Sequence, residues 1–351
     1  MVFIAYRRVR DKLWPESLPP RGIFDGQSVL VTGATGGLGL AATKHFVALG
    51  ATVIMTSRTL SQGLAARQQI EDDMGHEAKG KIRVMELDMS LYASCVSFVN
   101  ALRESDVGRR GLDCAVLNAG VISPDFIESK QGWEQTIQVN TLSTTLLGLL
   151  LLDWMKKTHQ PNRPTPHIVF VASRDHLDPD VKEWTEWGKN EGILRHLSNK
   201  ENWPTGQVDP NYAASKLMLM YAMEVLCQKA VNEEKEIQVI INTVCPGLVS
   251  TDIARSITKK STLMRLVVPV YLGVLGKSAN YGARFYVSAA LEPKANHGKN
   301  IQSLFSEEEY QKLAYDNMKS ETAQEVKGMV LNEIWDELKK NVPNMHSLLS
   351  K

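Results

Sequence analysis

Short runs of apolar residues recur along the chain and predict a series of buried strands. The six clearest runs are residues 28–32, 52–56, 82–87, 113–117, 167–171 and 237–244. Most are apolar at nearly every position rather than at alternate ones, which is typical of strands covered on both faces. Segments with helical spacing separate them, such as 38–49, 90–103 and 212–231. This alternation predicts an α/β fold: a doubly wound parallel sheet between two layers of helices.

The strand–helix pattern continues from about residue 27 to residue 290 without a linker, repeat or low-complexity tract. It therefore predicts a single domain, although a length of 351 residues alone would suggest about two. We expect an arm at 1–22, the main domain at 23–304 and a helical tail at 305–351, in which 307–340 forms one or two amphipathic helices. For the arm, packing on the sheet edge, binding to a partner and peripheral membrane contact all stay open.

Composition excludes several classes of protein. The 40 basic and 39 acidic residues nearly balance, which leaves no electrostatic footprint for nucleic acid. The four cysteines have no paired spacing, so buried reduced thiols and a cytoplasmic location are expected. The eight histidines have no metal-ligand spacing, and we predict no metal site.

Apolar stretches in the chain are too short to cross a membrane. The stretch at 1–6 precedes its basic residues, the reverse of a secretory signal. The stretches at 142–152 and 263–276 fall short of the ~20 residues that a membrane helix needs. We expect no transmembrane segment, and we interpret both stretches as core or pocket helices.

A glycine-rich turn joins the first predicted strand to the first helix, where residues 32–39 read TGATGGLG. Glycines let the backbone approach a pyrophosphate, whose charge the N–H groups of the helix start stabilise. The segment 37–42 also fits the G-x-G-x-x-A pattern, but the strand ends at Thr32, so Gly33 has to make the first turn. The predicted cofactor contacts here are Gly33, Thr35, Gly37, Leu38 and Gly39. A turn that only holds the helix to the sheet is the alternative.

The end of the second strand predicts which dinucleotide binds. Ser57 and Arg58 stand where an acidic residue would bind the ribose 2′-hydroxyl of NAD. A neutral residue followed by an arginine favours the 2′-phosphate, so we predict NADP(H); a solvated Arg58 is the alternative. Asp88, with Met89, follows the third strand and is placed to accept a hydrogen bond from the adenine amino group. Capping of the next helix is the other role open to Asp88.

Candidate chemistry lies further along the chain. Tyr212 and Lys216 are four residues apart, on the same side of a predicted helix, a pair that is common by accident. The pair becomes informative because of the other motifs and their order along the chain. They are the glycine-rich turn, Asn118-Ala-Gly120, Asn140, Ser173 and Pro246-Gly247. With these residues in this order, the chain resembles the short-chain dehydrogenase/reductase family from about residue 25 to residue 291.

The resemblance implies a role for each motif residue. Tyr212 is the general acid/base, and Lys216 holds the nicotinamide ribose and favours the phenolate by its charge. Ser173 hydrogen-bonds the substrate oxygen, and Asn140 holds a water that links Lys216 to solvent. Taken singly, Tyr212 could be a packing residue, Ser173 a strand-end serine and Asn140 a buried helix residue. Further cofactor contacts are implied at Asn118, Ala119, Gly120, Tyr212, Lys216, Pro246, Gly247, Val249 and Thr251.

Two segments depart from the usual pattern of the family. An insert at 174–211, with Trp184, Trp187 and Trp203, forms either a lid over the substrate or a surface excursion whose aromatic residues pack on the sheet. The substrate-loop position at 261–276 is rich in apolar residues and indicates a hydrophobic ligand. The later chain resembles the branch that includes retinol-dehydrogenase-like enzymes.

Together these features predict an NADPH-dependent oxidoreductase that interconverts a ketone or aldehyde and an alcohol on an apolar molecule. A retinoid, a steroid-like compound or a secondary-metabolite intermediate would suit it. A nucleotide-binding regulator or scaffold of the same fold and a non-redox cyclase or isomerase stay open. A Gly-x-Ser-x-Gly elbow is absent, which disfavours a hydrolase. The helices at 142–156 and 212–231 match those that pair subunits in relatives, so a homodimer stays open.

Overall fold

The computed structural model describes residues 2–349 except 14, 161–162, 205–206, 208–209, 250–272 and 274–275. In this part of the chain, one seven-stranded sheet has the order β3-β2-β1-β4-β5-β6-β7, and every neighbouring pair is parallel. The strands are β1 Ser28–Val31, β2 Thr52–Ser57, β3 Ile82–Glu86, β4 Cys114–Leu117, β5 His167–Val171, β6 Ile240–Val244 and β7 Asn300–Ile301. The prediction of a doubly wound parallel sheet is confirmed.

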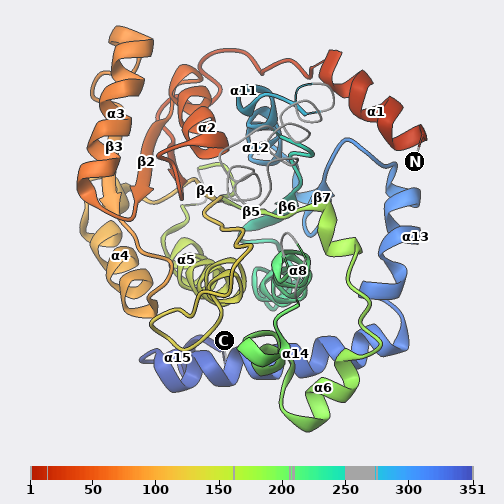
Figure 1. Ribbon diagram of the computed structural model, residues 1–351. Coiled ribbons are helices and arrows are strands. Elements are labelled where there is room, and N and C mark those ends of the chain that lie inside the picture. Colours follow the sequence, from red (N-terminus) through yellow and green to blue (C-terminus); the bar gives the residue numbers. More distant parts are fainter. Residues whose placement is uncertain are drawn as a thin grey trace.

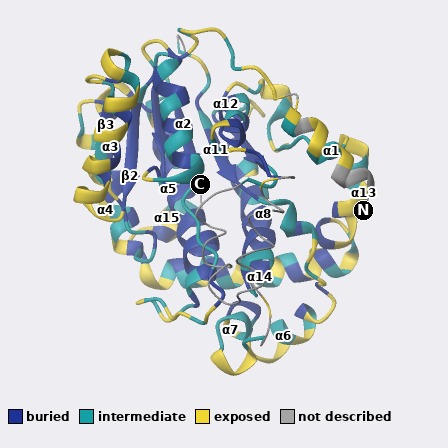
Figure 2. Cartoon of the chain, turned by 45° about the horizontal axis from the view of Figure 1, so that its top comes forward, coloured by how far each residue is buried: buried dark blue, intermediate teal, exposed yellow. Residues whose placement is uncertain are grey.

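Helices cover the two faces of the sheet as separate layers (Figure 1). One layer contains α2 (Gly37–Ala48), α3 (Leu60–Met74), α11 (Ala279–Gly282) and α12 (Arg284–Ala289). The other contains α4 (Tyr92–Glu104), α5 (Thr144–Thr158) and α8 (Tyr212–Lys229). Side chains of β1 alternate between the two cores, because Val29 and Val31 pack under α2 whereas Leu30 joins the opposite cluster. Figure 2 shows the strands buried between these layers.

Three further helices follow β7 and form the tail: α13 (Glu307–Met318), α14 (Glu321–Asn341) and α15 (Met345–Leu349). The side chains of Val326, Val330, Ile334 and Leu338, spaced by four, bury one stripe of α14 in the core shared with α5 and α8. The expectation of amphipathic tail helices is therefore met. The tail lies on α8 and α5: Lys327 pairs with Glu224 of α8 at 2.9 Å. It thus covers part of α5 and α8, the helices through which a homodimer stays open.

The N-terminal arm forms α1 (Val2–Leu13), which lies beside α13 (Figure 1). Arg7 donates two hydrogen bonds to the carboxylate of Glu309, at 2.7 and 2.9 Å, and one to the carbonyl of Leu304 at 2.8 Å. The arm is thereby attached to the start of the tail.

The insert after β5 contains α6 (Trp184–Asn190) and α7 (Ile193–Leu197), which pack on α14 at the side away from the strands (Figure 1). Glu333 of α14 accepts hydrogen bonds from the backbone N–H groups of Ile193 and Leu194, at 2.7 and 2.9 Å, and so caps α7. Trp184 is buried, and Trp187 stacks on His196 with ring centres 3.9 Å apart. The helices α6 and α7 of the insert thus pack on the tail rather than on the sheet, and both the lid role and the surface excursion stay predictions.

Several boundaries differ from the predictions. The helix expected at 142–156 is preceded by a wider π-helical turn, η3 (Ile137–Ser143), and the strand expected at 237–244 pairs in the sheet only from Ile240. The short 3₁₀ turns are η1 Gly75–Glu77, η2 Gly108–Arg110, η4 Arg174–Leu177, η5 Lys200–Asn202 and η6 Lys294–Asn296. The substrate loop expected at 261–276 lies almost wholly outside the described residues. Among the helices that the structure describes, none has the length and apolar character needed to cross a bilayer.

Candidate active site

The glycine-rich turn between β1 and α2 has little space for side chains. Gly33 and Gly37 adopt φ values of +63° and +53°, a region that favours glycine. At Gly39 an added Cβ would lie 2.3 Å from the carbonyl oxygen of Gly33 and 2.7 Å from Nδ2 of Asn118. The turn thus needs glycine at 33 and 37 for its conformation, and at 39 for close packing.

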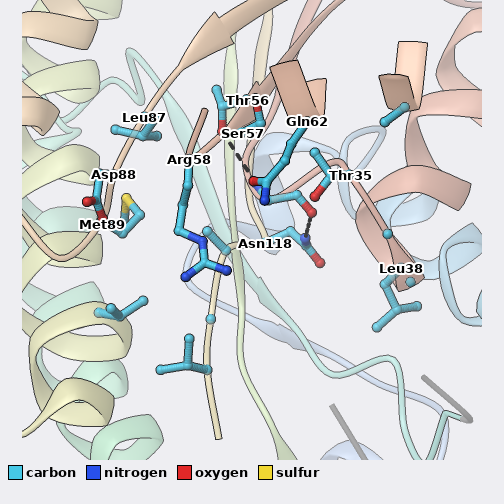
Figure 3. A pocket seen from close by; sticks show the side chains of 18 of the residues that line it. Thr35, Leu38, Thr56, Ser57, Arg58, Gln62, Leu87, Asp88, Met89 and Asn118 are labelled. Carbon is cyan, nitrogen blue, oxygen red and sulfur yellow. Dashed lines mark hydrogen bonds between the residues drawn. The ribbon is translucent and has the colours of Figure 1, made fainter. Parts of the chain in front are cut away.

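A cavity of about 870 Å³ opens beside this turn, at the carboxyl ends of β1 to β4 (Figure 3). A cavity of this size is suited to an extended cofactor. Its lining contains eleven predicted cofactor residues: Gly33, Thr35, Gly37, Leu38, Ser57, Arg58, Asp88, Met89, Asn118, Ala119 and Gly120. It also contains residues that the sequence analysis missed, namely Gly36, Thr56, Gln62, Ala65, Ala66, Gln69, Leu87, Ser90, Val121, Ile122, Gln135 and Val139.

The missed residues of α3 carry a weak sequence signal. Gln62 and Gln69 are seven positions apart, two helical turns, and so lie on one face of the helix that follows β2. The residues at the strand end alone do not indicate these two glutamines. The face of α3 that contains every seventh residue, and so both glutamines, is the signal that could indicate them.

Polar groups at the ends of β2 and β3 have distinct environments. Ser57 is buried and its hydroxyl donates to the carbonyl of Thr59 at 2.7 Å, so it shapes the turn into α3. Arg58 is exposed, and its side chain extends from the end of β2 into the cavity (Figure 3). Asp88 accepts two hydrogen bonds from Ser90, at 2.9 Å from N–H and 2.7 Å from Oγ. It closes a turn ahead of α4, whose N-cap is Leu91, so the capping alternative for Asp88 is wrong.

Asn118 faces the cavity, but its side chain is bonded to protein groups. Nδ2 donates to the carbonyl of Thr32 at 2.8 Å, and Oδ1 accepts from the hydroxyl of Tyr286 at 2.8 Å. Ala119 N–H donates to Oγ1 of Thr32 at 2.9 Å. These bonds tie the loop after β4 to the glycine-rich turn and to α12. No motif indicated Tyr286.

Tyr212 is the first residue of α8, and Lys216 follows one turn later. Lys216 is 5% exposed, and its Nζ donates to the carbonyl of Val171 at 2.8 Å. The same Nζ lies 5.6 Å from the centre of the Tyr212 ring, and an added Cβ at Gly120 would be 3.7 Å from it. Burial lowers the pKa of Lys216 to about 8. A cation this close to a phenol in a buried site favours the phenolate form.

Asn140 lies in the π-helical turn η3 and faces α8. Its Oδ1 accepts from Val121 N–H at 2.9 Å, and its Nδ2 donates to the Val121 carbonyl at 2.9 Å and to Ser215 Oγ at 3.1 Å. Ser215 in turn donates to the carbonyl of Tyr212 at 2.7 Å. The side chain of Asn140 therefore connects the loop after β4, at Val121, to the start of α8. The water-holding role of Asn140 stays a prediction.

The start of α8 is also held by a buried carboxylate that the sequence analysis missed. Glu134 is 0% exposed and accepts from Asn211 Nδ2 at 3.0 Å, Thr136 Oγ1 at 3.0 Å and Ile137 N–H at 3.2 Å. Burial raises the pKa of Glu134, and these hydrogen bonds oppose that shift. Asn211 directly precedes Tyr212, so Glu134 joins the start of α8 to the segment that carries Asn140.

Ser173 follows β5 and caps η4. Its Oγ accepts from Asp175 N–H at 3.3 Å, and its carbonyl accepts from His176 N–H at 3.2 Å. Because Oγ acts as the acceptor towards Asp175, its own proton can be donated elsewhere. η4 packs on α8, which brings the serine segment beside the helix of Tyr212 and Lys216.

The loop after β6 approaches the start of α2. Gly247 has a φ of +79°, and Val249 pairs with Lys277 in a parallel bridge. An added Cβ at Gly282 would lie 2.7 Å from Leu38 Cδ2 and 2.8 Å from Val249 Cγ2, so these two side chains converge. Pro246 is buried, and Thr251 lies outside the described residues. Lys277, buried beside Gly247, was not predicted.

Known proteins share this pattern. The family model described as short chain dehydrogenase matches residues 27–182. The short-chain dehydrogenase/reductase phmF of Phaeosphaeria nodorum is 31% identical over 80% of this chain and 78% of its own length. The chain belongs to the short-chain dehydrogenase/reductase family. A second member, ffsI of Aspergillus flavipes, is 31% identical over 96% of this chain and 94% of its own.

Solved structures of other proteins have a similar fold. L-sorbose reductase from Gluconobacter frateurii, complexed with NADPH and L-sorbose, has a TM-score of 0.58 and 18% identity, covering 82% of this chain and 100% of its own. A short-chain dehydrogenase/reductase from Burkholderia phymatum, in complex with NAD, has a TM-score of 0.55 and 18% identity, covering 79% and 89%. At these identities the likeness shows the fold alone. The retinol-dehydrogenase-like branch stays a prediction.

Proposed function

We propose that this short-chain dehydrogenase/reductase is an NADPH-dependent enzyme that interconverts a carbonyl group and an alcohol on an apolar small molecule. The observation that carries the proposal is the buried Lys216 ammonium, 5.6 Å from the Tyr212 ring centre. A buried charge without an ionic partner is costly for folding, so its presence points to a function that needs it. The proposal gives it one, because it stabilises a phenolate during proton transfer.

The residues that line the cavity fit a dinucleotide. The tight glycine-rich turn lets the backbone approach a pyrophosphate at the start of α2, and Asp88 lies further along for the adenine. Gly120 lines the same cavity. A Cβ added at Gly120 would lie 3.7 Å from Nζ of Lys216, so the ammonium is close to the cavity wall. When bound, the nicotinamide supplies or accepts the hydride.

The proton steps belong to residues of this chain. In reduction, Tyr212 gives its phenolic proton to the substrate oxygen and Ser173 donates a hydrogen bond to the same atom. Lys216 stabilises the phenolate that remains, by its charge. In oxidation the phenolate accepts the hydroxyl proton. Ser173 is suited to its role because its Oγ already accepts from Asp175, which leaves the hydroxyl proton for a ligand.

A screen of ketones and aldehydes against NADPH, followed by alcohols against NADP⁺, tests the function. Tyr212→Phe should keep the affinity for NADPH and lower turnover by ~10²–10⁴-fold, since it loses the transferred proton. A wild-type protein that binds NADPH but turns over no carbonyl would support the regulator or scaffold. Conversion of a substrate without NADPH consumption would support the cyclase or isomerase. Turnover retained by Tyr212→Phe would refute the role given to Tyr212.

The preference for NADPH rests on Arg58. Its guanidinium extends into the cavity at the end of β2, and the neighbouring Ser57 carries no negative charge to repel a 2′-phosphate. In Arg58→Asp the dissociation constant for NADPH should rise by about 10–100-fold and that for NADH should change less. Lys79→Asp, an equal change of charge at an exposed residue, is the control. An unchanged preference in Arg58→Asp would make Arg58 a solvated residue.

The remaining features of the proposal are the substrate class, the cellular location and the oligomeric state. An apolar substrate is supported by the Leu, Val and Met content of 261–276. The cysteines are unpaired, which agrees with a cytoplasmic location. A homodimer through α5 and α8 would have to accommodate α14 and α15, which lie on these helices. Light scattering of the purified chain would determine the oligomeric state.

A further inference from the structure

The tail helix α13 contacts the segment of the candidate catalytic serine through two buried side chains. His176, in η4, is 0% exposed, and its ring lies between Ser173 and Tyr310. Nδ1 is in hydrogen-bond contact with the carbonyl oxygen of Ser173, and Nε2 lies 3.1 Å from the hydroxyl of Tyr310. A residue of the tail is therefore connected to Ser173 through a single imidazole ring.

The protons of this chain of hydrogen bonds can be assigned by chemistry. A carbonyl oxygen only accepts, so Nδ1 of His176 carries the hydrogen. In the neutral ring Nε2 then accepts, and the Tyr310 hydroxyl donates to it. Burial lowers the pKa of His176 and raises that of Tyr310, which keeps the imidazole neutral and the phenol protonated. All three groups thus have compatible donor and acceptor roles.

Other contacts fix α13 relative to the site. Asn317 Nδ2 donates to the carbonyl of His176 at 3.4 Å, and the Asn317 carbonyl accepts from Tyr221 of α8 at 2.6 Å. The first turn of α13 has a capping box, in which Ser306 and Glu309 bond each other's backbone N–H groups. Arg7 of the arm donates two hydrogen bonds to the carboxylate of Glu309, the residue before Tyr310. Tyr310 is thus presented by a helix that is fixed at its start and near its end.

We propose that His176 and Tyr310 are positioning residues for Ser173, so that the tail helix completes the active site. The inference rests on the proposed function, in which Ser173 donates to the substrate oxygen. Two donors of the same residue, the N–H and Nδ1 of His176, hold the Ser173 carbonyl, while Asp175 N–H holds its hydroxyl oxygen. Displacement of the serine backbone would require the two bonds from His176 to break, and rotation of the serine side chain would require the bond from Asp175 to break. Tyr310 prevents the ring of His176 from turning.

Tyr310→Phe removes one hydroxyl and keeps the aromatic packing on His176. We expect kcat to fall about 3- to 10-fold, the effect of one hydrogen bond, with the dissociation constant for NADPH unchanged. His176→Leu removes both bonds and should lower kcat further. His176→Asn, whose amide nitrogen can replace Nδ1, should recover much of the loss, which a purely structural role would not predict. Tyr315→Phe, 55% exposed on the same helix, is the matched control.

Hydrogen exchange gives a second readout that does not require turnover. Amide exchange in residues 173–178 should become faster in Tyr310→Phe than in Tyr315→Phe, with exchange in α8 unchanged. If the wild type reduces carbonyls and Tyr310→Phe and His176→Leu leave both kcat and this exchange unaltered, the positioning role is wrong and the proposed function stands. If the wild type has no turnover but exchange responds as expected, the proposed function fails and the contact between tail and loop is retained.

Discussion

Replacing Lys216 by methionine is expected to stabilise the fold while it abolishes turnover. Lys216 is 5% exposed, and its ammonium is surrounded mainly by protein rather than water. Burial lowers its pKa from 10.5 to about 8. Methionine has a similar length and no charge, so it removes the desolvated ammonium with little change in packing.

The pKa gives the size of the effect. A folded-state pKa of about 8, against 10.5 for an unperturbed lysine, makes the protonated side chain cost roughly 3 kcal/mol in the folded state at pH 7. Methionine also loses the hydrogen bond from Nζ to the Val171 carbonyl, which offsets about 1–2 kcal/mol. The free energy of unfolding should therefore rise by about 1–2 kcal/mol at pH 7.

The pH dependence distinguishes this cause from better packing. The pKa of Lys216 is lower in the folded state than in the unfolded state, so the cost is fully present below about pH 8. Between about pH 8 and pH 10.5 the folded protein loses the proton first, and the wild type gains stability as the pH rises. The advantage of Lys216→Met should be largest at pH 7 and shrink as the pH approaches 10.

Urea denaturation at pH 7 and pH 9.5, without NADPH, measures these differences. Bound NADPH is omitted because it would add stability by mass action to whichever variant binds it. Lys79→Met, at an exposed lysine, is the control and should change stability by less than about 0.5 kcal/mol. A methionine variant that is less stable at pH 7, or whose advantage is equal at both pH values, would refute this account of Lys216.

Two further substitutions test the supports of the site. Glu134→Ala leaves the buried donors of Asn211 and Ile137 without their carboxylate and should lower the free energy of unfolding by about 2–4 kcal/mol. Glu134→Gln should lower the free energy of unfolding by less, and urea denaturation measures both variants. Gly39→Ala places a Cβ 2.3 Å from the Gly33 carbonyl and should cost about 1–3 kcal/mol and weaken NADPH binding in calorimetry. Gly328→Ala, with nothing within 4 Å of the added Cβ on an exposed helical face, is its control and should be neutral or stabilising. Equal behaviour of the two alanine variants would contradict the packing argument.

The sheet could be predicted because its strands are local and strongly apolar. β5 was predicted at its observed bounds, and β1 to β4 within one or two residues. β7 has only two residues, too few for any pattern. The π-helical turn η3 was also missed, since a wider turn has no distinct hydrophobic period at this length. Prediction thus failed where an element was too short to form a pattern.

The residues of the candidate site also fall into those that the sequence predicts and those that it does not. Motif residues of the glycine-rich turn and of the ends of β2, β3 and β4 line one cavity, because parallel strands end at the same edge of the sheet. Their supports come from segments far apart in the sequence. Tyr286 bonds Asn118 across 168 positions, and Tyr310 bonds His176 across 134. A single buried hydrogen bond has no periodicity, so no sequence pattern could indicate these partners.

The contacts of Asn118 and Asn140 show that motif side chains can hold neighbouring segments of the protein together. Both amides are bonded to backbone groups of neighbouring loops, and to Tyr286 and Ser215 respectively. Arg58, by contrast, extends into the cavity. Substitution of either asparagine should therefore act through the shape of the cavity, with a loss of stability, whereas substitution of Arg58 should change affinity alone. Motif residues of this kind are best interpreted as a frame that orients the residues able to touch a ligand.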